Sequence, residues 1–248
     1  MPNSTIAIIL PTYNESENIA SAISQIKHEL PNASIFVVDD KSPDGTAEVV
    51  KKLQRKTKNL YLVNNPNKGG RGKAVMAGFQ KAIKYKQIKI FIEMDADLQH
   101  QPSELKNLIK IVRKNSQTIA IASRYMKGGN TINWSLHRKI FSLIANNFLY
   151  LFLGFKLSDY TNGFRAYPRE AIEHLCECQL VSTSYVTLSE SALIMHHAKF
   201  KFKEVPCVFP QRVKGKSNAD LNELKDNLVG LYKINRKYHC CFSKLFSS

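Results

Sequence analysis

The stretch KIFIEMDADLQHQP, residues 89–102, begins as an apolar run and ends in polar side chains. A short apolar run of this kind is typical of a strand that is buried on both faces of a sheet. Asp95 and Asp97 follow this strand directly, with one alanine between them. Because two like charges repel each other at the end of a buried strand, we expect a cation to lie between them.

The rest of the first half alternates strand and helix patterns around this stretch. Apolar runs predict further strands at residues 5–11, 34–40, 60–63 and 118–124. Amphipathic patterns predict helices at residues 14–30, after the turn at 42–46, near 73–86 and after Pro102. Asn14 and Glu17 have the spacing of a capping box at the start of the first helix. This order predicts an α/β fold with a doubly wound, mostly parallel sheet and helices on both faces.

Polar clusters follow four of the five predicted strands. They are PTYNE (11–15), DDKSPDG (39–45), DADLQ (95–99) and SRY (123–125). In doubly wound sheets, ligands bind beyond the carboxyl ends of the strands. We therefore expect the four clusters to form one composite site.

The Asp95-Ala-Asp97 segment fits a hard divalent cation bound to diphosphate oxygens. Mg²⁺ or Mn²⁺ takes one or two carboxylates and completes its shell with substrate phosphate and water. Gln99 could add an amide oxygen, because side chains two residues apart on an extended backbone point the same way. A solvated turn is the alternative explanation of an Asp-x-Asp pattern.

Asp39 and Asp40 form a second acidic pair, after the strand at 34–40. Adjacent side chains on an extended chain point to opposite faces, so one aspartate can face a ligand while the other bonds the SPDG turn. The facing carboxylate could accept hydrogen bonds from a nucleobase or a ribose. The sequence does not say which aspartate has which role.

The charge of the chain indicates an anionic partner. Among 248 residues, 36 are basic and 20 acidic, which gives a net charge of +16. Nucleic acid, a phospholipid surface and phosphorylated substrates all fit such a charge, but no nucleic-acid-binding motif is present, so we expect no nucleic acid partner. The five cysteines have no metal-ligand spacing, and the N-terminus has no signal-peptide pattern. We expect reduced thiols and a cytoplasmic location.

The second half contains an apolar segment, RKIFSLIANNFLYLFLGFKL, at residues 138–157. Polar residues interrupt it too often for a membrane span. It could be a core helix or a helix at a membrane interface, with Arg138, Lys139 and Lys156 near lipid phosphates. A last helix carries a stripe of leucines that we expect to be packed, at positions Leu221, Leu224, Leu228 and Leu231. Its basic end could touch a membrane.

Seven segments occur in the order of a known family. They are LPTYNE (10–15), VVDDKSPDGT (37–46), MDADLQHQP (94–102), SRY (123–125), RKIFSLIAN (138–146), DYTNGFRAY (159–167) and FPQRVKGKSN (209–218). Through them the chain resembles the family-2 glycosyltransferases, most closely the polyprenyl-phosphate branch that includes dolichyl-phosphate mannose synthases. The resemblance implies a Rossmann-like GT-A domain at residues 1–218, in which residues 137–157 form the apolar helix. An amphipathic helix and a basic tail would follow at residues 219–248.

The activity that the resemblance implies is inverting, metal-dependent transfer of mannose from GDP-mannose to a polyprenyl, dolichyl-type phosphate. The cofactor would be Mg²⁺ or Mn²⁺. The enzyme would be peripheral on the cytosolic face of a membrane, alone or with a small membrane-protein partner. Two alternatives stay within the family: another sugar nucleotide of the UDP-glucose type, or a sugar hydroxyl acceptor with Glu190 as the general base. A basic membrane-surface binding module is the alternative outside enzymes, but it leaves the acidic clusters unexplained.

The resemblance also implies residue roles. The guanosine end of the donor would be held by Pro11, Tyr13, Glu15, Val38 and Asp40. The diphosphate would meet Asp95, Ala96 and Asp97, and the metal would bind Asp97 and Gln99, with Asp95 beside them. Catalysis would depend on Asp97, Arg124 and Arg212, the two arginines binding donor phosphates or the lipid phosphate. The acceptor would lie at Arg138 and Ser142.

Two departures from the family pattern bear on the donor sugar. The last motif usually ends in a phosphate-binding lysine where this chain has Asn218, although Lys214 or Lys216 could substitute. The GGRGKAV loop, residues 69–75, also departs from the Gly-Leu-Gly of the most similar mannose synthases. Both departures leave the donor open.

A phosphate acceptor needs cations more than it needs a general base. The second pKa of a phosphate monoester is about 6, so the group is mostly dianionic at cytosolic pH. Arginine suits it because the guanidinium can donate two parallel hydrogen bonds. Four arginines lie in the motif segments, namely Arg124, Arg138, Arg165 and Arg212. For Arg165, an ion pair with Asp159 is an equally good interpretation.

Overall fold

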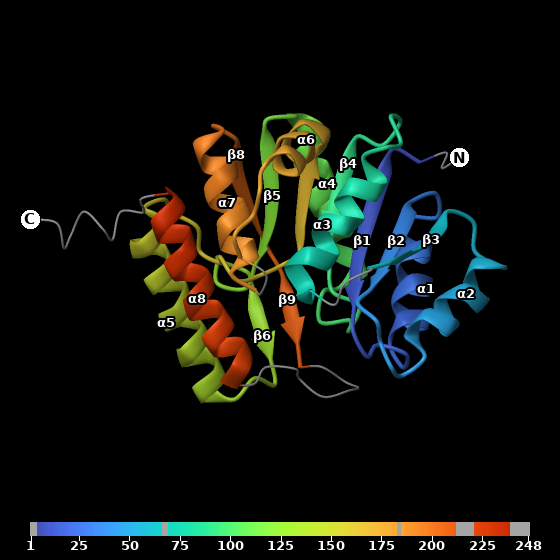
Figure 1. The fold of residues 1–248 in the computed structure, drawn as a ribbon, viewed down its shortest axis with the longest axis horizontal. Coiled ribbons are helices and arrows are strands. Elements are labelled where there is room, and N and C mark those ends of the chain that lie inside the picture. The colour runs from blue at the N-terminus through green and yellow to red at the C-terminus, as the bar shows by residue number, and fades with distance from the viewer. Residues whose placement is uncertain (1–3, 66–68, 183–184, 212–220, 239–248) are drawn as a thin grey trace, which may run out of the picture.

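A computed structural model of the chain describes residues 4–65, 69–182, 185–211 and 221–238, without the side chains of 221–224. Its main sheet has seven strands in the order β3-β2-β1-β4-β7-β5-β8 (Figure 1). The strands are β1 Ile6–Thr12, β2 Ser34–Asp39, β3 Leu60–Asn64, β4 Ile90–Glu93, β5 Thr118–Ser123, β7 Arg165–Pro168 and β8 Lys201–Pro206. Only β7 pairs antiparallel to its neighbours in this sheet. The predicted mostly parallel sheet is confirmed.

Helices cover both faces of the sheet. They are α1 Ile19–Glu29, α2 Thr46–Gln54, α3 Gly70–Ala82, α4 Leu105–Lys114, α5 Leu136–Leu153, α6 Arg169–Glu177, α7 Thr187–His197 and α8 Leu221–Tyr238. Successive side chains of β1 enter different cores: Ile9 packs with α3, α6 and α7, whereas Ile8 packs with α1, α2 and α4. This alternation explains why the strands are apolar at every position.

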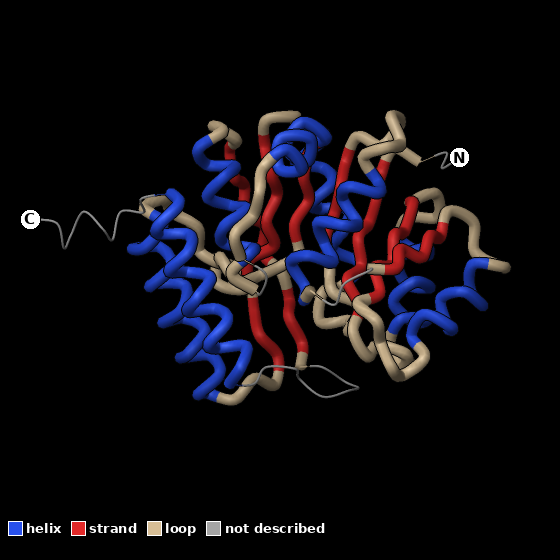
Figure 2. The backbone as a smooth tube through the Cα atoms, viewed as in Figure 1, coloured by secondary structure: helices blue, strands red, loops and turns tan. Residues whose placement is uncertain are grey.

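A second, two-stranded parallel sheet extends the molecule beyond the carboxyl end of β5. It pairs β6, Asn130–Ile132, with β9, Val208–Pro210, as Figure 2 shows below the main sheet. The backbone N–H of Cys207 donates to the carbonyl of Ser123, which joins the two sheets. The five strands predicted from apolar runs are all present, but β6, β7, β8 and β9 were not predicted.

The predicted capping box at Asn14 is wrong. Asn14 has a left-handed backbone, φ +59°, and α1 begins only at Ile19. The backbone N–H of Asn14 donates instead to Ser42 Oγ in the loop after β2. The residues before α1 therefore form a loop that is bound to its neighbour, which a local pattern of Asn and Glu cannot reveal.

The leucine stripe of α8 is only partly buried. Leu231 packs against the core and Ile234 is fully buried, but Leu228 is 61% exposed. Gly230, next to the core, brings the helix close to Val186. The side chains of Leu221 and Leu224 lie outside the described residues. The buried line of α8 therefore runs through Gly230 and Ile234 and not through Leu228.

Candidate functional site

Asp95 and Asp97 lie just beyond the end of β4, at the edge where β1 and β2 also end. We had assumed an extended backbone between Asp97 and Gln99. The structure shows a turn instead, because Leu98 has a left-handed φ of +62°. The turn nevertheless brings Gln99 back to Asp97, whose Oδ1 accepts the Gln99 N–H at 3.0 Å. The Gln99 amide nitrogen donates to the carbonyl of Pro210 at 2.8 Å, so the amide oxygen is the side-chain atom of Gln99 that could bind a metal.

These residues fit a hard divalent cation. Asp97 and Asp95 supply carboxylate oxygens and Gln99 an amide oxygen, the ligand types that Mg²⁺ and Mn²⁺ prefer. Within the part of the chain that the structure describes, no group of three or more His, Cys, Asp and Glu side chains could hold a metal ion. A metal at this edge would therefore take further oxygens from a bound diphosphate and from water.

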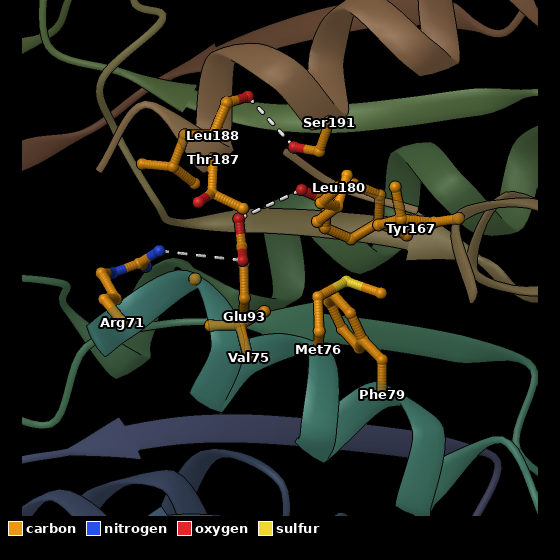
Figure 3. Close-up of a pocket in the computed structure, with 12 residues that line it drawn as sticks. Arg71, Val75, Met76, Phe79, Glu93, Tyr167, Leu180, Thr187, Leu188 and Ser191 are labelled. Carbon is orange, nitrogen blue, oxygen red and sulfur yellow. Dashed lines mark hydrogen bonds and ion pairs between the residues drawn. The ribbon is translucent and has the colours of Figure 1, made fainter. Parts of the chain in front are cut away.

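Arg71, in the first turn of α3, is a site residue that the sequence did not predict. Its Nε donates to Asp95 Oδ1 at 2.8 Å, and its Nη1 lies 3.9 Å from Glu93 Oε2. Figure 3 shows the guanidinium reaching Glu93 across the pocket between α3 and α7. Burial would lower the pKa of Arg71, but the charges of Asp95 and Glu93 raise it overall. The departure of the GGRGKAV loop from the family pattern was the available signal.

The side chain of His100 binds the backbone of Asp95. Its Nδ1 accepts the Asp95 N–H at 2.8 Å, and its ring stacks on Phe164 with 5.1 Å between centroids. Burial lowers the pKa of His100 to about 4, so the imidazole is neutral at pH 7. His100 therefore acts as a fixed hydrogen-bond acceptor.

The structure separates the roles of Asp39 and Asp40. Asp39 orders the turn after β2, because it accepts hydrogen bonds from the N–H and the hydroxyl of Ser42. Asp40 binds the segment that leads into α3, through hydrogen bonds from Asn65, Gly69 and Gly70. Both carboxylates thus hold loops at the edge of the sheet in this structure.

The other residues expected at the guanosine end differ in accessibility. Pro11 and Tyr13 are half-buried at the end of β1, and Glu15 is buried in the loop that follows. Val38 is fully buried and packs against Gly78 of α3, so its side chain does not face the edge. We had expected Val38 to help hold the guanosine. Only its backbone could make that contact.

Arg124 is held in a buried ion pair. Its Nε and Nη2 each lie 2.7 Å from a carboxylate oxygen of Asp159, and Nη2 also donates to Thr161 at 2.7 Å. Asp159 is fully buried and Arg124 is 8% exposed. Burial would lower the pKa of Arg124, but Asp159 raises it. The predicted phosphate ligand is therefore also the counter-charge of a buried aspartate.

The ion pair that we had considered between Arg165 and Asp159 is wrong. Arg165 is buried in β7 and donates to three backbone carbonyls, those of Tyr160, Asn162 and Leu188. Arg124 binds the Asp159 carboxylate instead. Arg165 therefore connects β7 to the start of α7 and does not reach the edge of the sheet as a phosphate ligand.

Arg138 and Ser142 lie one turn apart near the start of α5. Ser135 caps this helix by accepting the Arg138 N–H at 3.4 Å. The Arg138 guanidinium lies 3.7 Å above the ring of Trp134, and the Ser142 hydroxyl accepts a hydrogen bond from Tyr125 at 2.6 Å. Both residues thus have fixed positions beside the loop that follows β5.

The residues predicted to bind the acceptor lie near those predicted to bind the metal. Burial lowers the pKa of Arg138, and the charge of Arg124 lowers it further, whereas the charge of Asp97 opposes the shift. Arg138 and Arg124 both lie over the ring of Trp134, at 3.7 and 5.3 Å from its centroid. That ring packs on Phe209 beside Pro210, whose carbonyl accepts the Gln99 amide. A phosphate bound at Arg138 would therefore be close to a diphosphate bound at Asp97.

Arg212 and Glu190 are the remaining predicted residues. Arg212, with Lys214, Lys216 and Asn218, lies outside the described residues. Glu190 is fully buried and accepts hydrogen bonds from Val181 and Ser182. Because these donors enclose its carboxylate, Glu190 anchors the loop before α7 and is a poor general base for a sugar hydroxyl.

The sequence matches the model of the glycosyl transferase family 2 over residues 7–176. A polyprenol monophosphomannose synthase of Mycolicibacterium smegmatis is 33% identical, over 91% of this chain and 84% of that protein. An undecaprenyl-phosphate mannosyltransferase of Micrococcus luteus is 30% identical, over 93% and 91%. A dolichol-phosphate mannosyltransferase of Pyrococcus furiosus is 34% identical over 92% of this chain, which spans 63% of that protein.

Solved structures share the fold at low identity. A glucosyl-3-phosphoglycerate synthase from Mycobacterium tuberculosis, in complex with Mn²⁺, uridine diphosphate and glucosyl-3-phosphoglycerate, has a TM-score of 0.67 at 16% identity. That match covers 94% of this chain and 80% of the other. A mannosyltransferase from Pyrobaculum calidifontis, in complex with GDP-Man and Mn²⁺, has a TM-score of 0.59 at 19% identity, over 87% and 59%.

Proposed function

Because the chain belongs to glycosyl transferase family 2, we propose that it transfers mannose from GDP-mannose to a polyprenyl phosphate. The expected GT-A fold and the class of the enzyme, a glycosyltransferase, are confirmed, so the non-enzymatic binding module is excluded. The observation that carries the substrate is the agreement of three relatives, each named for mannose transfer to a polyprenol-type phosphate and each matched over more than 90% of this chain.

The reaction is a single displacement at the anomeric carbon of mannose. An oxygen of the lipid phosphate forms the new bond on one face while the bond to the GDP oxygen breaks on the other, which inverts the configuration. The acceptor phosphate is already mostly dianionic near neutral pH, so no side chain has to remove a proton. A divalent metal would neutralise the charge that develops on the departing diphosphate.

The residues of the edge divide between the two substrates. Asp97 and Gln99 would hold the metal beside the diphosphate. Arg138 is exposed and near Asp97, and it would bind the lipid phosphate, with Ser142 one turn further along the same helix. Arg124 is buried against Asp159 and would act mainly through its charge and through the position it gives to the loop after β5.

The outer face of α5 supports a membrane-surface location. Four of its apolar side chains are more than half exposed, namely Leu136 at 69%, Phe141 at 65%, Ile144 at 61% and Leu151 at 58%. Arg138 and Lys139 lie in the first turn of α5, where they would meet lipid phosphates. None of the helices within the described residues has the length and apolar character needed to cross a membrane.

Helix α8 would add to the same surface. Figure 1 draws α5 and α8 at the same end of the longest axis. Leu228 and Tyr232 of α8 are 61% and 67% exposed, and its last turn is basic. We propose that the enzyme is peripheral on the cytosolic face, with residues 219–248 following the transferase domain. A small membrane-protein partner would contact this apolar surface.

The test is a reaction with defined donors and acceptors. Purified protein is incubated with vesicles that contain a polyprenyl phosphate and with labelled GDP-mannose or UDP-glucose, in Mg²⁺ or Mn²⁺. We expect lipid-linked mannose with inverted configuration, and little product from UDP-glucose. Product from UDP-glucose alone would contradict the donor. Transfer to a free sugar hydroxyl with none to the lipid phosphate would contradict the acceptor.

A further inference from the structure

Two arginines of the candidate site lie on the ring of one tryptophan. Trp134 lies between β6 and α5, and it is the single tryptophan of the chain. The guanidinium of Arg138 lies 3.7 Å from the centre of its ring, and that of Arg124 lies 5.3 Å from it. Two positive charges beside one ring repel each other, so each guanidinium needs partners that hold it there.

Arg124 has several partners besides the tryptophan. Its guanidinium pairs with the carboxylate of Asp159 and donates to the hydroxyl of Thr161. The rings of Tyr125 and Phe209 lie 5.3 and 5.2 Å from it. Arg124 would therefore keep its position if the tryptophan were removed.

Arg138 has only the Trp134 ring to hold its guanidinium among the described residues. No hydrogen bond or ion pair of this guanidinium occurs within that part of the chain, because Ser135 binds only the backbone N–H of Arg138. Fixing a long side chain costs conformational free energy. A guanidinium that lies over an indole is already ordered, because the ring face attracts the cation. Its N–H donors stay open to a phosphate.

The Trp134 ring is itself held in place. It is 8% exposed and packs against Phe209 of β9, with 5.6 Å between the ring centres and the planes nearly perpendicular. Phe209 packs in the same way against His100, whose Nδ1 accepts the Asp95 N–H. A ring that is fixed on both sides can fix a guanidinium that lies on it.

We propose that Trp134 is a positioning residue that holds the Arg138 guanidinium ready for the phosphate of the acceptor lipid. This inference rests on the proposed transfer to a polyprenyl phosphate. With Arg138 held by the ring and Arg124 held by Asp159, two guanidinium groups are gathered before the lipid arrives. A phosphate dianion then relieves the repulsion between them.

A direct contact between Trp134 and the phosphate is the competing explanation. The indole N–H is buried and has no hydrogen-bond partner among the described residues, so it could donate to a phosphate oxygen. In our proposal the ring face acts through Arg138, and the N–H is not required. A variant that keeps a ring but loses the N–H separates the two explanations.

The first measurement is the fluorescence of Trp134, which reports the contact without any substrate because the chain has no other tryptophan. Arg138→Ala uncovers the ring, so we expect emission at longer wavelength and stronger quenching by acrylamide than in the wild type. Lys139→Ala is the matched control, because it removes the same charge from the next residue of α5 and should leave the emission unchanged. An unchanged spectrum in Arg138→Ala would overturn the proposal.

The second measurement is transfer from GDP-mannose to polyprenyl phosphate in vesicles. Trp134→Leu should raise the KM for polyprenyl phosphate about tenfold and leave the KM for GDP-mannose near the wild-type value. Trp134→Phe keeps a ring, so its KM for polyprenyl phosphate should rise only about threefold. It also provides the readout if the leucine variant does not fold. A rise as large in Trp134→Phe as in Trp134→Leu would assign the role to the N–H and contradict the proposal.

The double-mutant cycle with Arg138→Ala tests whether the ring acts through the arginine. If it does, the effect of Trp134→Leu on the KM for polyprenyl phosphate should be at least about threefold smaller in Arg138→Ala. Equal effects in both backgrounds would overturn the proposal. If the wild type makes no lipid-linked mannose, the proposed function fails and the role of Trp134 in transfer fails with it, whereas the fluorescence result still stands.

A second control removes an aromatic ring far from the acceptor residues. Tyr85 precedes β4, at the end of the sheet opposite Asp97, and its ring lies 5.9 Å from those of Phe36 and Tyr61. Tyr85→Leu should lower the unfolding temperature and leave both KM values unchanged. If it raises the KM for polyprenyl phosphate as Trp134→Leu does, the rise reports general destabilisation and the proposal is wrong.

Discussion

The loops after β1 and β2 differ from the outer face of α5. The polar groups of the loops are bound within the protein, whereas the apolar side chains of α5 are exposed. In the loops, the backbone N–H groups of residues 14, 15 and 16 each donate across the gap, to Ser42, Thr46 and Asp44. The two loops are thus bound to each other before any ligand arrives. On α5, apolar side chains such as Phe141 and Ile144 remain largely exposed.

This difference indicates which substrate the protein can bind alone and which requires a membrane. The loops after β1 and β2, which we propose to hold the nucleotide, need little further ordering to bind it, because their polar groups are already hydrogen-bonded. An exposed apolar face gains its stabilisation only when another apolar surface removes it from water. We therefore expect donor binding to be independent of lipid, and acceptor use to depend on the membrane.

The largest effect should come from Asp97. Removing a metal ligand removes the charge stabilisation of the departing diphosphate, so Asp97→Ala should lower the transfer rate by about a thousandfold or more. An excess of chelator should do the same to the wild-type enzyme. Vesicle binding should not change, since α5 is intact. Full transfer activity in excess EDTA would end the metal hypothesis.

The next effect concerns the buried pair of Arg124 and Asp159. Arg124→Ala leaves a buried carboxylate without its counter-charge, which costs about 3–5 kcal/mol of folding free energy. In a chain of this size the unfolding temperature should fall by roughly 10 °C. Arg124→Ala with Asp159→Ala should recover part of that loss.

The alternative for Arg124 gives a different result. If Arg124→Ala unfolds at the wild-type temperature and weakens the binding of both substrates, the residue is chiefly a phosphate ligand. The two outcomes are separated by thermal unfolding measured beside substrate titration. The structure favours the first, because Nε and Nη2 both face Asp159.

A smaller effect should come from Arg138. A charge-assisted hydrogen bond to the lipid phosphate is worth about 1.5–3 kcal/mol, so Arg138→Ala should raise the KM for polyprenyl phosphate roughly ten- to a hundredfold. The KM for the sugar nucleotide should stay close to the wild-type value. Loss of nucleotide binding with normal lipid dependence would show that our division of the edge is wrong.

Local sequence patterns were enough to predict the strands from β1 to β5. The strands β1, β2, β4 and β5 are apolar runs buried on both faces, and β1, β2 and β5 lie within about one residue of their predicted bounds. The predicted fourth strand, KIFIEMDAD, was too long, because β4 ends at Glu93. The strand β7 has no such pattern, because its four residues, RAYP, include a buried arginine and a proline. Its place between β4 and β5 follows from tertiary pairing, which no local window contains.

The site divides in the same way. The Asp95 and Asp97 pair could be predicted from its place after a buried strand. Arg71 could not, because it lies 24 residues away from Asp95 and nothing in the sequence of its loop indicates which carboxylate it contacts. Two arginines could have paired with Asp159, and only the fold decides for Arg124 over Arg165.

The exposed face of α5 gives the next prediction. Phe141→Asp or Ile144→Asp should weaken binding to anionic vesicles by about tenfold each, because an apolar contact with lipid is replaced by a charge. Both variants should unfold at the wild-type temperature. Phe152→Asp is the contrasting variant, since Phe152 is 5% exposed and packs in the core. A lower unfolding temperature in Phe141→Asp and Ile144→Asp would show that this face of α5 packs against other parts of the protein and not against lipid.

The smallest effect should come from Asp44, which binds the two donor loops together. Its carboxylate accepts hydrogen bonds from the N–H of Ser16 at 2.9 Å and from the N–H and hydroxyl of Thr46 at 3.0 and 2.6 Å. Burial would raise the pKa of Asp44, but these hydrogen bonds lower it below its ordinary value of 3.8. Because the folded pKa is the lower one, the carboxylate stabilises the fold above pH 3.8 and loses that contribution as the pH falls through the folded pKa. Asp44→Asn should therefore cost about 1 kcal/mol at pH 7, a modest value because the group is exposed, and less at pH 3. Urea unfolding at both pH values measures this, and equal losses would show that the charge of Asp44 does not hold the loops together.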